Sequence, residues 1–174
     1  ISGTAEAGST IQLFDGTTPI LGTFTASNGS FSIPISLSEG KHTITAKATD
    51  SLGNASAASA GLDVTIDTTA PVAPTGLDLA AEDDNGASNS DNITSNTTGL
   101  TITGTGEAGS TLELFDGIAR IGTVVVKADG TFTRDVSLAV GTHSITAQST
   151  DVAGNTGDFS SALQITVTAP AALA

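Results

Sequence analysis

Apolar and polar residues alternate in short segments along the whole chain, and Asn-Gly or Asp-Gly pairs separate several of these segments. A side-chain period of two is typical of a β-strand with one buried face, and such pairs favour tight turns between strands. The apolar positions that we assign to strands in the second half are Leu77 and Leu79, Leu100 and Ile102, Leu112 and Leu114, Val124 and Val126, Phe132, Val136 and Leu138, His143, Ile145 and Ala147, and Leu163, Ile165 and Val167. No segment has a helical period of useful length, so the pattern predicts an all-β protein.

The pattern occurs twice. The segment ISGTAEAGSTIQLFDG at 1–16 returns as ITGTGEAGSTLELFDG at 102–117, and GKHTITAKATDSLGN at 40–54 returns as GTHSITAQSTDVAGN at 141–155. Both pairs are offset by 101 residues, which is the length of one immunoglobulin-like sandwich with its linker. The sequence therefore predicts two tandem immunoglobulin-like antiparallel β-sandwiches.

The two copies are not equally complete. Residues 69–101, a linker, a short strand and a long acidic loop, have no counterpart before Ile1. We therefore expect a truncated module at 1–68 that begins at the second strand, strand B, and a complete module at 69–174 with its linker and an acidic loop between strands A and B. The first module should lack its N-terminal strand and expose a sheet edge. Its apolar strand positions are Ile11 and Leu13, Phe31, Ile33, Ile35 and Leu37, Ile44 and Ala46, and Leu62, Val64 and Ile66, and Arg134 in the second copy stands where Ile33 does, as expected at a sheet margin.

Composition excludes several classes of function. The net charge is −13 with five Lys and Arg residues, so nucleic acid and anionic membranes are poor partners. There is no Cys for disulfides or thiolate metal sites, and no apolar run long enough for membrane insertion. The chain has no nucleophile elbow, phosphate loop or HExxH motif, and no Trp or Tyr for a sugar platform. We therefore expect a protein that is not an enzyme, in which an acidic surface favours multivalent cations or solubility.

Oxygen ligands are expected to meet where the linker enters the second module. In a seven-stranded antiparallel sandwich, the B–C and F–G loops lie at the pole beside the incoming linker. Asp67 lies in that linker, Glu107 in the B–C loop, and Asp151 and Asn155 in the F–G loop. Carboxylate and amide oxygens are the ligands that Ca²⁺ prefers, so these four residues form a candidate metal site. The alternative is that both aspartates form turns and that Glu107 is simply solvated.

A second candidate metal site is the acidic loop at 82–91. Asp83, Asp84 and Asp91, with Asn85 as a further donor, resemble the alternating oxygen ligands of calcium loops, although the spacing is not that of an EF-hand. The alternative is a disordered polar loop. In the first module, the set that corresponds to the linker site is Glu6, Asp50 and Asn54, which should bind weakly or not at all because its linker aspartate is missing.

The two histidines occupy equivalent positions. His42 and His143 each follow a Gly by two residues at the start of strand F. Sandwich domains often place a Tyr near this corner, and its hydroxyl bonds back to the chain. We expect His to take that structural role here, since no second His or Cys stands nearby to complete a zinc site.

With these motifs in place, the chain resembles the bacterial immunoglobulin-like repeats of giant secreted adhesins, including repeats-in-toxin (RTX) and biofilm-associated proteins. The motifs that carry the resemblance are GTAEAGST and GTGEAGST, the LFDG turns, the NGSF and DGTF turns, the TDSLGN and TDVAGN loops, the DTTAP linker and DDNGASNSDNIT. The resemblance implies type I export, tandem arrays and calcium at module junctions, with ligands at Asp67, Glu107 and Asp151 and further ligands at Asp83, Asp84 and Asp91. After strand G of the second module, the sequence Val167-Thr168-Ala169-Pro170 lacks the linker aspartate. Either the array ends there or the next junction lacks that ligand.

Three functions remain after these steps. The first is a non-catalytic stalk of a secreted or cell-surface bacterial adhesin, whose partners are the neighbouring modules of the same chain and which projects a distal domain toward an unknown ligand. The second is a module that itself contacts a host glycan or protein, and the third is a spacer in a secreted hydrolase. The near-identity of the copies favours the stalk, because a dedicated binding face would be expected to diverge between copies.

Overall fold

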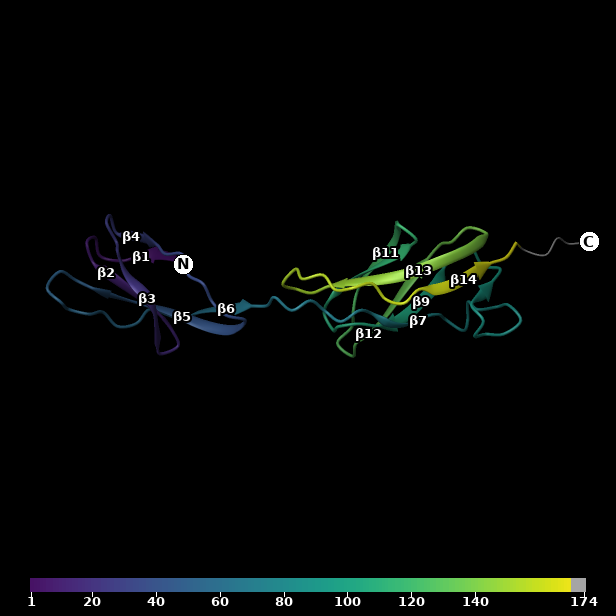
Figure 1. Ribbon diagram of the computed structural model, residues 1–174, viewed down its shortest axis with the longest axis horizontal. Coiled ribbons are helices and arrows are strands. Elements are labelled where there is room, and N and C mark those ends of the chain that lie inside the picture. Colours follow the sequence, from purple (N-terminus) through teal and green to yellow (C-terminus); the bar gives the residue numbers. More distant parts are fainter. Residues whose placement is uncertain (170–174) are drawn as a thin grey trace, which may run out of the picture. The chain divides into compact units, whose positions relative to one another are not determined.

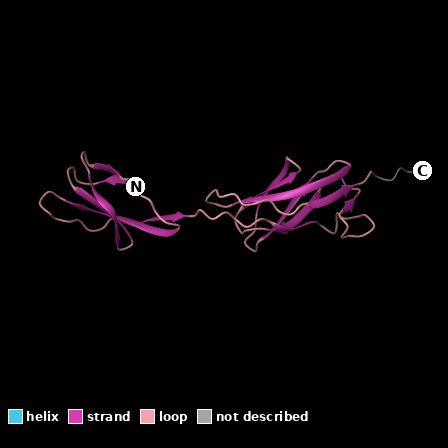
Figure 2. Cartoon of the chain, viewed as in Figure 1, coloured by secondary structure: helices cyan, strands magenta, loops and turns pink. Residues whose placement is uncertain are grey.

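The computed structural model describes residues 1–169, apart from the side chain of Leu21. These residues form two compact units, the first at Ile1–Thr68 and the second beginning at Thr69. All regular elements are strands (Figures 1 and 2). No helix in the described part is long and apolar enough to cross a membrane. The segment after strand G of the second module, 167–170, in which no linker aspartate was found, ends at Pro170, and Pro170 lies outside the described residues.

The second unit is a sandwich of two sheets. One sheet has the order β12 (Thr131–Val136), β9 (Leu100–Thr105), β7 (Thr75–Leu79). The other has the order β11 (Ala119–Val125), β10 (Thr111–Asp116), β13 (Gly141–Thr150), β14 (Leu163–Val167), β8 (Ile93–Thr94). Neighbouring strands are antiparallel except β14 and β8, which are parallel. The chain therefore leaves one sheet after β7 and joins the other at β8, so the acidic loop at 82–91 links two strand segments on opposite sheets.

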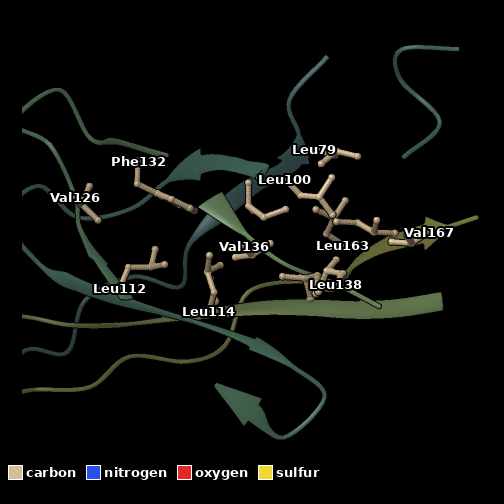
Figure 3. Close-up of a cluster of buried hydrophobic side chains, with 14 residues drawn as sticks. Leu79, Leu100, Leu112, Leu114, Val126, Phe132, Val136, Leu138, Leu163 and Val167 are labelled. Carbon is tan, nitrogen blue, oxygen red and sulfur yellow. The ribbon is translucent and has the colours of Figure 1, made fainter. Parts of the chain in front are cut away.

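The core of the second unit lies between its two sheets. Alternate residues of facing strands point into it, as the period of two predicts. Figure 3 shows this cluster, in which Leu112 and Leu114 come from one sheet and Leu100, Phe132 and Val136 from the other. Leu77 and Val124 pack against it while staying partly exposed. Nearly all the apolar positions assigned from the sequence therefore belong to one contiguous core.

The first unit contains the same strands from the second onward. β1 (Ser2–Thr4) pairs with β4 (Ser30–Ser32), and the other sheet has the order β3 (Thr18–Thr25), β2 (Thr10–Asp15), β5 (Gly40–Thr49), β6 (Leu62–Ile66). Residues 1–68 have no counterpart of β7 or β8. The predicted fold class, two immunoglobulin-like sandwiches of which the first lacks its N-terminal strand, is confirmed.

One strand of the first unit is shorter than predicted. The sequence placed Ile33, Ile35 and Leu37 in a strand with Phe31, but β4 ends at Ser32. Pro34 has no N–H to donate to a ladder, and in the second unit the equivalent residue is Asp135, which pairs with Thr101. Ile33 nevertheless stays buried.

Arg134, the residue that corresponds to Ile33, lies on β12 and is exposed. Among residues 1–169, β12 pairs with β9 alone, so the predicted position at a sheet margin is confirmed.

Candidate functional site

The F–G turn of the second unit is organised by the carboxylate of Asp151. Its Oδ1 accepts hydrogen bonds from the backbone N–H groups of Ala153 and Asn155, both at 2.8 Å, and its Oδ2 accepts one from Nδ2 of Asn155 at 2.8 Å. The bond from the Asn155 side chain, together with the backbone N–H donors, outweighs burial and lowers the pKa of Asp151. The aspartate is therefore ionised at neutral pH and acts as the turn-forming residue that the sequence left open as an alternative.

The first unit repeats this turn around Asp50. Asp50 Oδ1 accepts from the N–H groups of Leu52 and Asn54 at 2.9 and 2.8 Å, and its Oδ2 accepts from Asn54 Nδ2 at 2.8 Å. The hydrogen bond from the Asn54 side chain is the main reason why the pKa of Asp50 is lowered. The F–G turn of the first unit is therefore held by hydrogen bonds within residues 50–54.

Both oxygens of the Asp151 carboxylate accept hydrogen bonds within its own turn. Glu107 lies in the B–C turn, where its backbone carbonyl accepts from the N–H and the Oγ of Ser110 at 3.1 and 2.7 Å. The side chain of Glu107 is exposed. These oxygens are of the kind that Ca²⁺ prefers as ligands.

The linker of the second unit runs beside the F–G segment. A Cβ added at Gly157 would lie 2.1 Å from the carbonyl oxygen of Pro71, so the backbone of residue 157 is in close contact with the linker. The predicted meeting of linker and F–G loop at one pole is thus found within this unit. Asp67 belongs to the first unit, so its joint role with Glu107 and Asp151 stays a prediction.

The acidic loop uses its carboxylates to hold its own backbone. Asp84 is 3% exposed, and its two oxygens accept from the N–H groups of Asn92 and Ile93 at 3.0 and 3.1 Å. Asp91 Oδ1 also accepts from the Ile93 N–H, at 3.2 Å, and Asp83 Oδ2 accepts from the N–H of Thr101 at 2.8 Å. These bonds hold the loop against β8 and β9, which favours a structured loop over the disordered alternative.

The neighbouring amides take part in the same network. Asn85 Oδ1 accepts from the N–H of Ser95 at 2.8 Å. Asn92, with a φ of 56°, accepts from the N–H of Leu79 through its own side chain. Among residues 1–169, no group of three or more Asp, Glu or His side chains lies close enough to hold a metal ion.

Both histidines bond back to the chain, as predicted. Nε2 of His42 lies 2.9 Å from the carbonyl oxygen of Ser38, and Nε2 of His143 lies 2.8 Å from that of Ala139. Their second partner was not predicted from the sequence. Nδ1 of each ring lies 2.6 to 2.7 Å from the carboxylate of the LFDG aspartate, Asp15 in the first unit and Asp116 in the second.

These contacts favour the protonated rings. The hydrogen bond to Asp15 and then that to Ser38 raise the pKa of His42. For His143, burial lowers the pKa, but the hydrogen bonds to Asp116 and Ala139 outweigh it, and the net direction is upward. In an imidazolium both ring nitrogens donate. Each His therefore links its own strand, β5 or β13, to the LFDG turn and to the loop that precedes the strand.

Comparison with known proteins gives one family. The model of the bacterial Ig-like domain family matches residues 1–68 and again 70–168. No curated protein matches the chain in sequence.

Several solved structures are similar. The fibronectin(III)-like modules of Clostridium thermocellum CbhA are 17% identical, with a TM-score of 0.50, over 100% of this chain and 88% of theirs. The BSP domain structure of a biofilm associated protein is 25% identical (TM-score 0.37, 99% of this chain, 27% of that chain), and that of a 1.5-MDa bacterial ice-binding adhesin is 24% identical (TM-score 0.44, 97% of this chain, 57% of that chain). The chain thus spans less than two thirds of either of these last two structures.

Proposed function

Because the chain belongs to the bacterial Ig-like domain family, we propose that it is a non-catalytic extender segment of a bacterial surface or secreted adhesin. The observation that carries this proposal is the tandem repetition of one module with its loops and turns retained. Repeats that each contact their neighbours build length rather than a single deep site. The absence of Trp and Tyr from the sequence argues against a glycan platform in either copy.

We further propose that Ca²⁺ stiffens the linker between the two modules. Asp67, Glu107, Asp151 and Asn155 would supply oxygen ligands, and the acidic loop with Asp83, Asp84 and Asp91 would be a second place for the ion. Three features support this proposal: the lowered pKa of Asp151, the exposed carboxylate of Glu107, and the contact of Pro71 with the F–G segment of the same unit. A bound cation would also offset the repulsion within a chain of net charge −13.

The test compares the chain with calcium and with chelator. We expect calcium to narrow the range of interdomain distances in small-angle scattering. It should also raise the melting temperature, because a ligand at a hundredfold excess over its Kd adds about 2.7 kcal/mol to the free energy of unfolding. Asp67→Ala should remove the change in scattering without unfolding either module. Asp78→Ala, which removes an exposed carboxylate on β7 outside the proposed ligand set, is the matched control and should behave like the parent chain. Identical scattering and melting in the two conditions would disprove the stiffening.

A further inference from the structure

Asparagine stands directly before glycine at two places in the chain, Asn28-Gly29 and Asn85-Gly86. In such a pair the backbone nitrogen of the glycine can attack the side-chain carbonyl carbon of the asparagine, because glycine has no Cβ to hinder the approach. Asparagine is accordingly among the thermolabile residues of proteins. The two pairs share this chemistry, so their structural surroundings decide which of them reacts.

Asn28 lies in an exposed turn between β3 and β4. Its side-chain Oδ1 accepts a hydrogen bond from Oγ of Ser30 at 2.9 Å. Ser30 belongs to the same turn, so this bond does not tie the side chain to another part of the fold. Among residues 1–169, no group accepts a hydrogen bond from Nδ2 of Asn28, the nitrogen that would leave.

The nucleophile of this pair, the backbone nitrogen of Gly29, is also unengaged. In the part of the chain that the structure describes, the N–H of Gly29 has no acceptor, whereas that of Gly130 in the corresponding turn donates to the carbonyl of Lys127 at 2.9 Å. A Cβ added at Gly29 would meet the carbonyl oxygen of Ala5 at 3.5 Å, which is an ordinary contact. The turn therefore has room to bring this nitrogen toward Cγ of Asn28.

Asn85 is exposed as well, so solvent access does not distinguish the two asparagines. Its Oδ1 accepts three hydrogen bonds, from the N–H of Ser95 at 2.8 Å, from Oγ of Ser95 at 3.3 Å and from Oγ1 of Thr94 at 3.4 Å. The backbone of Gly86 is tightly packed, since a Cβ added there would lie 2.9 Å from both Cβ and the carbonyl oxygen of Ile93. Attack at Asn85 therefore requires the loop to leave β8 first.

We propose that Asn28 is a site of spontaneous deamidation and that the fold protects Asn85 from the same reaction. The Gly29 nitrogen forms a bond to Cγ of Asn28, the Cγ–Nδ2 bond breaks, and ammonia leaves with the proton that the Gly29 nitrogen gives up. Water then adds to either carbonyl carbon of the cyclic imide and opens it to aspartate or isoaspartate. The reaction consumes water alone and needs no oxidant or reductant. It is independent of calcium and of the adhesin assignment.

The second unit shows that an aspartate fits this turn. Asp129 stands at the position of Asn28, and its Oδ1 accepts from the N–H and Oγ1 of Thr131 at 2.9 and 2.7 Å. These hydrogen bonds lower the pKa of Asp129. Ser30 carries the same two donor groups, an N–H and a hydroxyl, so we expect the aspartate product to keep the turn and to add one negative charge to the first unit.

The test follows the isotope-labelled full chain in mildly alkaline buffer, where an amide nitrogen loses its proton more readily. The side-chain amide signals of Asn28 and Asn85 in NMR spectra report the two sites separately, and chromatography with mass spectrometry of proteolytic peptides identifies the products. We expect the Asn28 signal to disappear at least about tenfold faster than that of Asn85, because several hydrogen bonds to Asn85 must break first. Aspartate and isoaspartate should both form at position 28. Equal loss at the two sites, or faster loss at Asn85, would overturn the proposal.

The control is the same chain unfolded in guanidinium chloride, where both pairs lose their surroundings. The difference between Asn28 and Asn85 should disappear there, through faster loss at Asn85. A difference that persists in the unfolded chain would assign it to local sequence and refute the protection by the fold.

The variant Asn28→Asp provides the reference for the aspartate product. Its first unit should melt no lower than that of the parent chain, since the second unit already holds a carboxylate in this turn. A lower melting temperature would refute the fit of a carboxylate at position 28.

Discussion

The hydroxyl oxygen of Ser149 is buried, with no hydrogen-bond partner among the described residues. The corresponding residue of the first unit is Ala48. A buried hydroxyl without a partner costs free energy relative to a methyl group of similar size. We expect Ser149→Ala to stabilise the second unit by about 1 kcal/mol, measured as a higher midpoint in its thermal or denaturant unfolding.

The control is a buried serine that does have a partner. Ser110 Oγ donates to the carbonyl oxygen of Glu107 at 2.7 Å, so Ser110→Ala should instead lower the stability by about 1 kcal/mol. A loss of stability in Ser149→Ala as large as that in Ser110→Ala would mean that its hydroxyl is bonded in solution.

The histidine pairs predict a pH dependence. A raised pKa in the folded state means that the stabilisation is fully present below the unfolded pKa and is lost as the pH rises through the folded pKa. As the pH rises above the ordinary His value of about 6.5 and passes through the raised pKa of His143, the melting temperature of the second unit should therefore fall. Asp116→Asn should flatten that slope, because it removes the carboxylate that holds His143 protonated.

Asp15→Asn is the matched variant in the first unit, where it should flatten the slope of the first transition and leave the second unchanged. A slope that Asp116→Asn leaves intact would assign the pH dependence to other groups. The position of the histidines was predictable from the sequence, but the aspartate partner was not. Asp15 and His42 are 27 residues apart, and an Asp before a Gly indicates only a turn until the strands are paired.

At the scale of elements, Asp84 holds the crossing from one sheet to the other. Its carboxylate accepts two backbone N–H groups just before and within β8, and it is almost fully buried. Asp84→Ala leaves those two donors without their partner, which should cost about 1–3 kcal/mol in the stability of the second unit. Measurement of this loss with calcium and with chelator separates a structural role of Asp84 from a role as a calcium ligand. An equal loss in both conditions indicates a structural residue, whereas a loss seen with calcium alone would indicate a ligand.

The strands were predictable to different degrees. Strands of five or more residues, such as β10 and β13, contain enough alternation for the period of two to identify them. β8 has two residues and therefore no period, so the acidic segment read as one uninterrupted loop. The sequence grouped Asp83, Asp84 and Asp91 as candidate calcium ligands, and that role stays a prediction. Their hydrogen bonds to Thr101, Asn92 and Ile93 depend on the sheet crossing, which local sequence does not specify.

At the scale of the whole molecule, the repeat did most to predict the fold. An offset of 101 residues gave the module length and the equivalence of loops. It could not give the exposure of equivalent side chains in the two units. Leu62 and Leu163 occupy equivalent positions in similar segments, and their different exposure arises from β7 and β8, which are far from both in sequence.

The two units should therefore differ greatly in stability. The buried hydrophobic core described for the second unit contains 14 residues, and that of the first contains four. Since burial of apolar surface is the main favourable term in folding, the first unit should unfold at a clearly lower temperature, as a separate calorimetric transition. Leu13 and Leu114 are equivalent and both nearly inaccessible, which provides a matched pair of variants to assign the transitions. Leu114→Ala should lower the free energy of unfolding of the second unit by about 2–5 kcal/mol and so shift the upper transition. Leu13→Ala should shift only the lower transition, that of the first unit. A single transition that both variants shift equally would show that the two units unfold as one.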